Sequence, residues 1–466
     1  MMLLVRHITC LMALLPTLLA AQSTQTTSIA QAAPPSTILD GYIREGLANN
    51  LGLRQESLDI RRVTESLNQA RSLFYPRVAF NPTYSLAAGG RRLEFPVGDL
   101  LNPAYKTLNT LTGSDNFPTN IPNVNQLLAP NNFHDTKVTF QYALFNTDVQ
   151  YNYLIQKQLL SAQEARRHVI ENELRYSITT AYFQYLQSLD AVHIIQNARL
   201  VLSELARLNE KLVNNNVATK EILTSARYEI SKVDQQLATA GKNRETARAY
   251  LNFLVNRDLT APVAVDSSLT KILPESPENL PDLQQTALRE RQELAQLGGS
   301  LKAAQTAVRL NEANATIPNL YIGGNAGFQG FGYTFRNQAY AIAQVGLQWD
   351  IFRGYEKRSK IQQAKIQTDA IQTRLQDVQR QIQLQVLQAY YDLDAANESL
   401  AATQSGIVNA DATFRVIDSK YRNGQALLIE FLRYQNDRLT AQLQHSLART
   451  DVLVKRAALD RAVAVK

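Results

Sequence analysis

The sequence predicts an elongated, mainly α-helical protein with a small β part, built from long coiled-coil hairpins and four strands per chain. Three observations predict this class. Apolar residues recur at helical spacing over very long stretches, several ten-residue segments alternate with period two, and the whole pattern occurs twice. With 19 Gly and 15 Pro in 466 residues, turn-forming residues are modest in number, as is usual for long solvated helices.

The N-terminal segment has the pattern of an export signal. Arg6 and His7 precede an apolar run, and small residues that suit cleavage follow it. We expect a signal peptide over residues 1–21, with cleavage as late as residue 32 as the alternative. The run is too short to span a membrane, and no later window of 18 residues is uninterruptedly apolar, so any crossing would be made by strands. The only cysteine, Cys10, lies inside this segment.

Charge and motif content point away from catalysis. The formal net charge is +7, but basic residues are interspersed with acidic ones, so no concentrated face for nucleic acid is expected. None of the five histidines stands at metal-ligand spacing with another histidine or a carboxylate. No phosphate loop, nucleophile motif or paired-carboxylate cleft is found. We therefore expect no enzyme activity, no cofactor, no metal and no nucleic-acid partner.

The first structural repeat is expected over residues 37–257. In order, it should contain a helix, a strand at 77–88, a surface loop at 89–135, a strand at 136–145, a long helix at 147–213, a tight turn at 214–218 and a helix at 219–257. In the second strand Val138, Phe140 and Tyr142 alternate with smaller or polar residues. The long helix alone would span about 100 Å at 1.5 Å per residue, so the molecule must be elongated.

Residues 258–281 carry four prolines and predict a linker between the repeats. The second repeat should follow at 282–466, with helices, a strand at 319–330, a short loop at 331–338, a strand at 339–351, a long helix at 355–422, a turn at 423–425 and a helix at 426–464. Nine apolar positions from Ile371 to Leu400 step by threes and fours, which keeps one narrow face of that helix apolar.

The four strands raise a question of assembly. Each is about ten residues long, the length that a tilted strand needs to cross a bilayer. Four strands cannot close a barrel within one chain, and lipid does not tolerate an open sheet edge. If the strands cross a membrane, several copies must share one barrel. A half-buried sheet in a soluble domain is the alternative that the strands alone leave open.

Taken together, these features resemble the TolC family of outer-membrane efflux proteins. The resemblance rests on two repeats that each contain a proline-led strand, a strand ending in an aromatic-polar turn ("LFNTD", "IFRGY"), an early "AY" in the long helix and a helical reversal. It covers roughly Ile38 to Lys466. It implies a homotrimer whose chains share a twelve-strand β-barrel and an α-helical tunnel through the periplasm. It places the 258–281 linker in an equatorial region and makes the 89–135 loop extracellular.

The resemblance also implies a function. The protein would be the passive exit duct of a tripartite efflux or type I secretion system in the outer membrane of a Gram-negative-type bacterium, extending into the periplasm. Implied partners are further copies of itself, outer-membrane lipid, a periplasmic adaptor (membrane fusion) protein and an inner-membrane efflux pump or ABC transporter. A periplasmic coiled-coil scaffold or adaptor is the alternative; a porin is disfavoured because most of the chain is helical.

Candidate residues of the periplasmic entrance come from the same resemblance. The family pattern has a tyrosine three residues before the tip glycine, matched by Tyr421, and an acid six residues after it, matched by Glu430 and by Glu221 in the first repeat. Ala426 and Arg433 stand where a well-known member has an arginine and a second acid. We expect an entrance closed by packing, by hydrogen bonds of the Tyr421–Glu221 type and by a mixed-charge ring, with Tyr421 facing Glu430. The simpler interpretation is that Glu430 and Arg433 are ordinary solvated residues, or that they pair with each other as i, i+3 neighbours.

The two helical reversals are the expected tips and the candidate contacts for an adaptor. Their residues are Asn215, Asn216, Val217, Asn423, Gly424 and Gln425. Asn423-Gly424 is a strong turn signal. In the first repeat we expect Asn215 at the place of the tip glycine, because asparagine tolerates a left-handed backbone.

Overall fold

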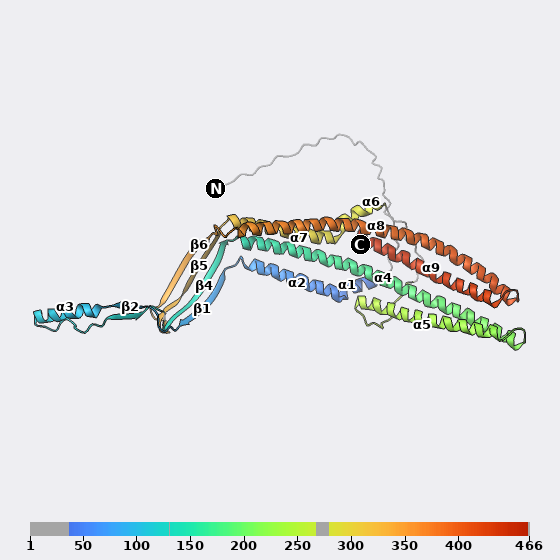
Figure 1. Cartoon of the computed structure of the whole chain (residues 1–466), viewed down its shortest axis with the longest axis horizontal. Coiled ribbons are helices and arrows are strands. Elements are labelled where there is room, and N and C mark those ends of the chain that lie inside the picture. The colour runs from blue at the N-terminus through green and yellow to red at the C-terminus, as the bar shows by residue number, and fades with distance from the viewer. Residues whose placement is uncertain (1–36, 130, 267–278, 465–466) are drawn as a thin grey trace, which may run out of the picture.

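The computed structural model describes residues 37–129, 131–266 and 279–464, so the predicted signal peptide and part of the predicted linker lie outside the described residues. The molecule is a long, narrow slab (Figure 1). Long helices occupy one end, a tilted sheet follows them, and a thin arm continues beyond the sheet. Within the described residues, no helix is both long and apolar enough to cross a membrane.

The two repeats fold into the same order of elements. The first has α1 (Thr37–Asn49), α2 (Leu51–Ser72), β1 (Arg77–Ser85), β4 (Phe133–Phe145), α4 (Thr147–Asn214) and α5 (Glu221–Val255). The second has α6 (Leu280–Glu290), α7 (Gln292–Thr316), β5 (Asn319–Phe331), β6 (Ala339–Gln348), α8 (Glu356–Arg422) and α9 (Leu428–Val463). The long helices α4 and α8 contain 68 and 67 residues, which corresponds to about 100 Å each.

Each repeat breaks its first helix at one extended residue. Asn50 (ψ 129°) caps α2, because its side chain accepts hydrogen bonds from the backbone of Gly52 and Leu53. Arg291 (ψ 121°) separates α6 from α7, and its buried guanidinium donates to Ala462 O at 3.1 Å and to the Glu293 carboxylate at 2.7 Å. That arginine therefore fastens the start of the second repeat to the C-terminal end of α9.

The expectation of a plain loop over 89–135 is wrong. The segment contains β2 (Arg92–Phe95), α3 (Val97–Thr112) and β3 (Val124–Leu127), and β2 pairs with β3 in an antiparallel ribbon. The many asparagines that suggested a loop instead satisfy the backbone of the returning chain. Asn102, for example, bonds both Ile121 O and Ile121 N, at 2.9 and 2.7 Å.

The remaining boundaries differ from expectation by a few residues. β1 ends at Ser85 rather than at 88, β4 begins at Phe133 rather than at 136, and β6 ends at Gln348 rather than at 351. These shifts follow the pairing, since the registered pairs of β1 with β4 extend from Arg77–Gln141 to Ser85–Phe133. Pairing with a neighbour, not residue type, decides where a strand stops.

The four long strands form one antiparallel sheet in the order β1-β4-β5-β6, and both edge strands lack a partner within the described part of the chain. The register aligns apolar or small residues across all four strands, as in the row Phe80, Val138, Ala326 and Ala341. The next position along each strand gives the opposite face, as in the row Asn81, Lys137, Gly327 and Tyr340. The sheet is thus apolar on one face and largely polar on the other.

The helices form two hairpins, α4–α5 and α8–α9, which contact each other through α4 and α9. Two ion pairs join α4 and α9 at different positions along these helices. Arg461 bonds Glu173 at 2.5 Å, and Arg449 bonds Asp190 nearer the tips. Buried apolar residues lie in three clusters along the helices, so the core is a narrow seam and not a compact centre.

The slab has two different long edges. The first repeat supplies one of them with β1 and α5, and the second repeat supplies the other with β6 and α8 (Figure 1). Both edges expose large apolar side chains. On α5 these are Tyr228, Tyr250 and Phe253, and on α8 they are Leu384, Tyr391, Val408 and Val416.

Candidate functional site at the hairpin tips

The two reversals have the same backbone geometry. In the second, Asn423 (φ −92°) is followed by Gly424 (φ 71°), and the N–H groups of Gly424 and Gln425 bond the last helical carbonyls at 3.0 and 2.8 Å. In the first, Asn215 (φ −90°) is followed by Asn216 (φ 57°), with equivalent bonds at 3.0 and 2.9 Å. Both are helix ends closed by one left-handed residue.

This geometry corrects one expectation. Asn216, not Asn215, is the counterpart of Gly424, because Asn216 is the residue with positive φ. Asparagine occupies the left-handed region at lower cost than most side chains, which explains why no glycine is needed there. The helices beyond the turns also begin later than expected, at Glu221 rather than 219 and at Leu428 rather than 426.

Large apolar side chains are exposed at both tips. Val217 is 70% exposed at the first tip, and Leu427 and Ile429 are 68% and 69% exposed at the second. The acidic side chains near the tips accept hydrogen bonds from neighbouring residues of their own chain. The backbone N–H of Leu427 donates to the Glu430 carboxylate at 2.9 Å, which caps α9, and the Thr219 hydroxyl donates to Glu221 at 2.8 Å.

Tyr421 contacts a residue that the sequence reasoning missed. Its hydroxyl donates to Asn209 Oδ1 at 2.7 Å, and Asn209 Nδ2 donates to Ile222 O at 3.1 Å. Asn209 lies on α4 and is fully buried. It therefore joins the end of α4, the start of α5 and the end of α8. Burial raises the pKa of Tyr421, with the hydrogen bond to Asn209 acting in the opposite direction.

Within the chain, the Tyr421 hydroxyl bonds Asn209 and not the expected Glu221, and the Glu430 carboxylate bonds the backbone of Leu427 and not Tyr421. The Tyr421 ring lies against Phe431, with ring centroids 5.3 Å apart, and this contact directs its hydroxyl toward Asn209 between the hairpins. A signal for Asn209 was present in the sequence. It continues the buried stripe of Leu202 and Leu205 at helical spacing, and a polar residue on an apolar stripe needs a buried partner.

Arg433 is a weakly paired charge at the second tip. Its side chain is 75% exposed, and its ion pair is with Asp437 at 4.0 Å, not with Glu430. The guanidinium also lies 5.8 Å from the centroid of the Tyr434 ring. An exposed pair at that distance contributes little, so the positive charge of Arg433 is only weakly compensated.

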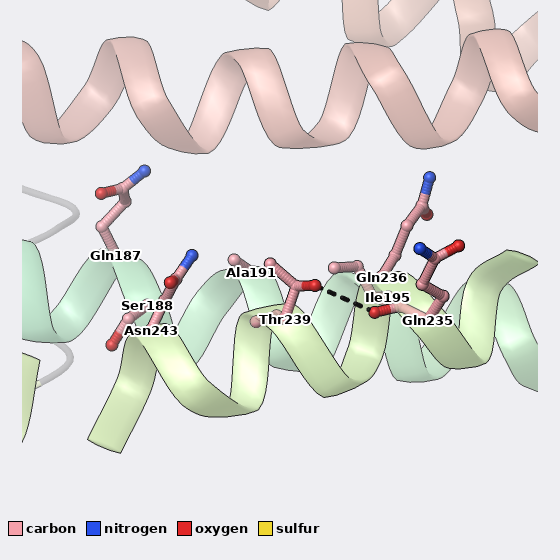
Figure 2. Close-up of a pocket in the computed structure, with 9 residues that line it drawn as sticks. Gln187, Ser188, Ala191, Ile195, Gln235, Gln236, Thr239 and Asn243 are labelled. Carbon is pink, nitrogen blue, oxygen red and sulfur yellow. Dashed lines mark hydrogen bonds between the residues drawn. The ribbon is translucent and has the colours of Figure 1, made fainter. Parts of the chain in front are cut away.

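A groove of about 520 Å³ lies farther from the tips, between α4 and α5 (Figure 2). Its polar lining residues are Gln187, Ser188, Gln235, Gln236, Thr239 and Asn243. The Thr239 hydroxyl donates to Gln235 O at 3.1 Å, while Gln187 and Gln236 extend away from the two helices (Figure 2). These neutral groups offer hydrogen bonds but no acid or base. Among the described residues, no group of three or more His, Cys, Asp or Glu could hold a metal ion.

Comparisons with known proteins agree with this architecture. Residues 283–465 match the family described as outer membrane efflux protein. The outer membrane efflux protein BepC of Brucella suis biovar 1 (strain 1330) is 23% identical over 431 residues, covering 91% of this chain and 84% of BepC.

Two solved channels share the fold. The structure of CusC aligns with a TM-score of 0.75 at 15% identity over 94% of this chain and 95% of its own. The open state of the Neisseria gonorrhoeae MtrE outer membrane channel aligns with a TM-score of 0.72 at 16% identity, over 93% and 94% of the two chains.

Proposed function

We propose that this chain is an outer membrane efflux protein and that three copies of it form one continuous exit duct. The family match of residues 283–465 and the fold of the whole chain support this proposal. The outer membrane is its location. In the proposed duct, the strands of each copy lie in the membrane and the long helices extend into the periplasm.

The two-faced sheet is the observation that carries the proposal. Its apolar face is uncovered, with Val78 66% exposed and Phe80 65% exposed, while the opposite face bears Lys137 and Gln141. Three copies supply twelve strands, and pairing β1 of one copy with β6 of the next satisfies both open edges. The apolar face then meets lipid and the polar face lines water.

The helical end closes in the same way. Because the two long edges of the slab differ, the contact between copies is head-to-tail, and such contacts form a ring when the rotation closes. The exposed apolar residues of α5 face those of α8 in the next copy. Three copies then give a wall of twelve helices that continues the barrel into the periplasm.

The duct is passive in this proposal. An inner-membrane efflux pump or ABC transporter supplies the energy, and a periplasmic adaptor joins the pump to the six hairpin tips. Docking of the adaptor separates the tips, which the Tyr421–Asn209–Ile222 contacts otherwise hold together within each chain. Support for the docking site comes from the apolar side chains of Val217, Leu427 and Ile429, which are exposed at the tips.

Sizing and conductance of the full chain test the assembly. Detergent-extracted protein should sediment at about three times the mass of one 52.1 kDa chain, less any leader, and should form stable pores in planar bilayers. A protein that is released without detergent and sizes as a monomer would contradict the duct and support the periplasmic scaffold.

A ring of three Arg433 side chains at the entrance should make the pore prefer anions. Arg433→Glu should shift the reversal potential toward cation selectivity at low salt, and the shift should shrink at 1 M salt, where the screening length is about 3 Å. The matched control is Arg61→Glu on α2, an exposed arginine far from the tips, which should leave selectivity unchanged. Equal selectivity of the native protein and Arg433→Glu would exclude the ring.

A further inference from the structure

An arm projects from the end of the sheet that is remote from the helices (Figure 1). The outer arm, residues 91–128, consists of the β2–β3 ribbon and helix α3, and it continues along the long axis of the molecule. Gly89 (φ 74°) and Gly90 (φ 106°) form one side of its base. These backbone conformations are open to glycine at little cost.

One face of α3 is fully used by its own arm. Asn109 bonds both backbone groups of Phe117, at 2.7 and 3.0 Å, as Asn102 does with Ile121. Gly98 approaches the same segment so closely that a Cβ atom there would lie 2.0 Å from Ile121 O. This close fit gives the arm a defined shape and leaves the opposite face of α3 free.

The free face of α3 carries an exposed apolar stripe. Leu100, Leu108 and Leu111 are 63%, 38% and 78% exposed, and Ala104 lies between the first two. The positions step by four, four and three residues, so they share one side of the helix. A short stripe of this spacing is the kind that parallel helices bury against one another.

We propose that the α3 stripes of three copies pack together beyond the rim of the duct and form a three-helix crown over its outer mouth. The inference rests on the trimer proposed above, because only a shared axis brings three arms to the same height. The alternative is that the α3 stripe binds to a lipid surface. The direction of the arm disfavours it, since α3 continues along the long axis and does not turn to lie across the end of the sheet (Figure 1).

The dimensions allow the arms to meet. Twelve strands about 4.8 Å apart and tilted by about 40° close a barrel with a backbone radius of about 12 Å. Three helices packed about 10 Å apart lie about 6 Å from their common axis. Each arm therefore needs to lean inward by only about 6 Å, which is small compared with the length of about 24 Å of the 16-residue α3.

The charge of the arm permits the contact. Arg91, Arg92 and Lys106 are balanced by Glu94, Asp99 and Asp115, so residues 91–128 have a formal net charge of zero. Three copies brought together do not accumulate charge of one sign, and none of the stripe positions is charged. The crown would narrow the exit, so substrates leave as the three helices part.

Cysteine cross-linking in the full-length protein tests the crown. Because Cys10 is the only cysteine and lies in the predicted signal peptide, Leu111→Cys places one thiol per mature chain on the stripe. A short bis-maleimide should convert the Leu111→Cys protein to covalent dimers several times more efficiently than the control Lys106→Cys. Lys106 is also exposed but lies about 140° around the helix from Leu111.

The design separates the crown from the trimer. Each variant is sized in detergent before cross-linking. A trimer in which Leu111→Cys links no better than Lys106→Cys would overturn the crown and leave the duct intact, whereas a native chain that sizes as a monomer would overturn both. As a second readout, Leu100→Asp combined with Leu111→Asp should raise single-channel conductance. The introduced carboxylates on the three α3 helices would repel one another, so the helices would separate and the exit would widen. Unchanged conductance would count against a crown over the mouth.

Discussion

Replacing Asn209 with leucine should raise the open probability of the reconstituted channel by about tenfold or more. The substitution removes the acceptor of the Tyr421 hydroxyl between the two hairpins, and it removes the side-chain donor to Ile222 O within the first hairpin. A buried group left without its partner costs about 1–3 kcal/mol. Each 1.4 kcal/mol that destabilises the closed arrangement is a factor of about ten in the equilibrium. Single-channel recording in planar bilayers measures the change.

A double-mutant cycle isolates the contact. Tyr421→Phe should open the channel in the same direction as Asn209→Leu, and the two effects should be less than additive, because both remove the same hydrogen bond. Asn197→Leu is the matched control on α4, since the Asn197 side chain is exposed and bonds His193 of its own helix. Full additivity, or opening by the control, would show that Asn209 does not tie the hairpins together.

The ionisation of Tyr421 predicts that opening of the channel also depends on pH. Its pKa is raised in the folded protein, so the neutral hydroxyl stabilises the tip at every pH below about 10, the usual tyrosine pKa. This stabilisation is lost as the pH rises through the raised pKa of Tyr421 in the folded protein. Native channels should therefore open in strongly alkaline solution, and the Tyr421→Phe channel should lack this response.

Carboxylates at the tips should abolish transport in cells without harming the duct. Val217→Asp combined with Leu427→Asp converts one large exposed apolar side chain of each tip to an acid. If an adaptor buries both residues, losing them removes about 3–6 kcal/mol of binding, or about a hundredfold to ten-thousandfold in affinity. Accumulation of a fluorescent efflux substrate, in cells that contain the cognate adaptor and pump, measures the loss.

The control for this prediction is Leu58→Asp on α2, another exposed leucine, which should leave transport unchanged. Both proteins should still form trimers that conduct in planar bilayers. Normal efflux by the tip double variant would show that the adaptor binds elsewhere on the helices. Failure of that variant to assemble would instead make the tips part of the trimer contact.

The repeated elements were predictable because their signals are local. The apolar stripe from Ile371 to Leu400 and the alternation of Val138, Phe140 and Tyr142 each reflect the period of one element. The observed α8 and β4 contain these residues with the expected faces. The tip turns were equally visible, since Asn-Gly needs no tertiary contact to favour a left-handed residue.

The misses had a common physical cause. Asparagine side chains can bond a backbone anywhere in the fold, so composition alone does not distinguish the asparagines of a loop from Asn102 and Asn109 in the arm. The same limit concealed Asn209. Its position on the apolar stripe was readable, but its partner Tyr421 lies 212 residues away, and only the packing of the two hairpins against each other brings them together.

The amino-acid sequence by itself determined that this chain consists of two copies of one elongated helix-and-strand unit, because periodicity and turn chemistry act within a few residues. The tertiary structure decided which residues join those units. It aligned the strands into a sheet with one apolar and one polar face, selected Asn209 rather than Glu221 as the partner of Tyr421, and folded residues 91–128 into an arm. Contacts between distant segments depend on register and packing, which no local pattern contains.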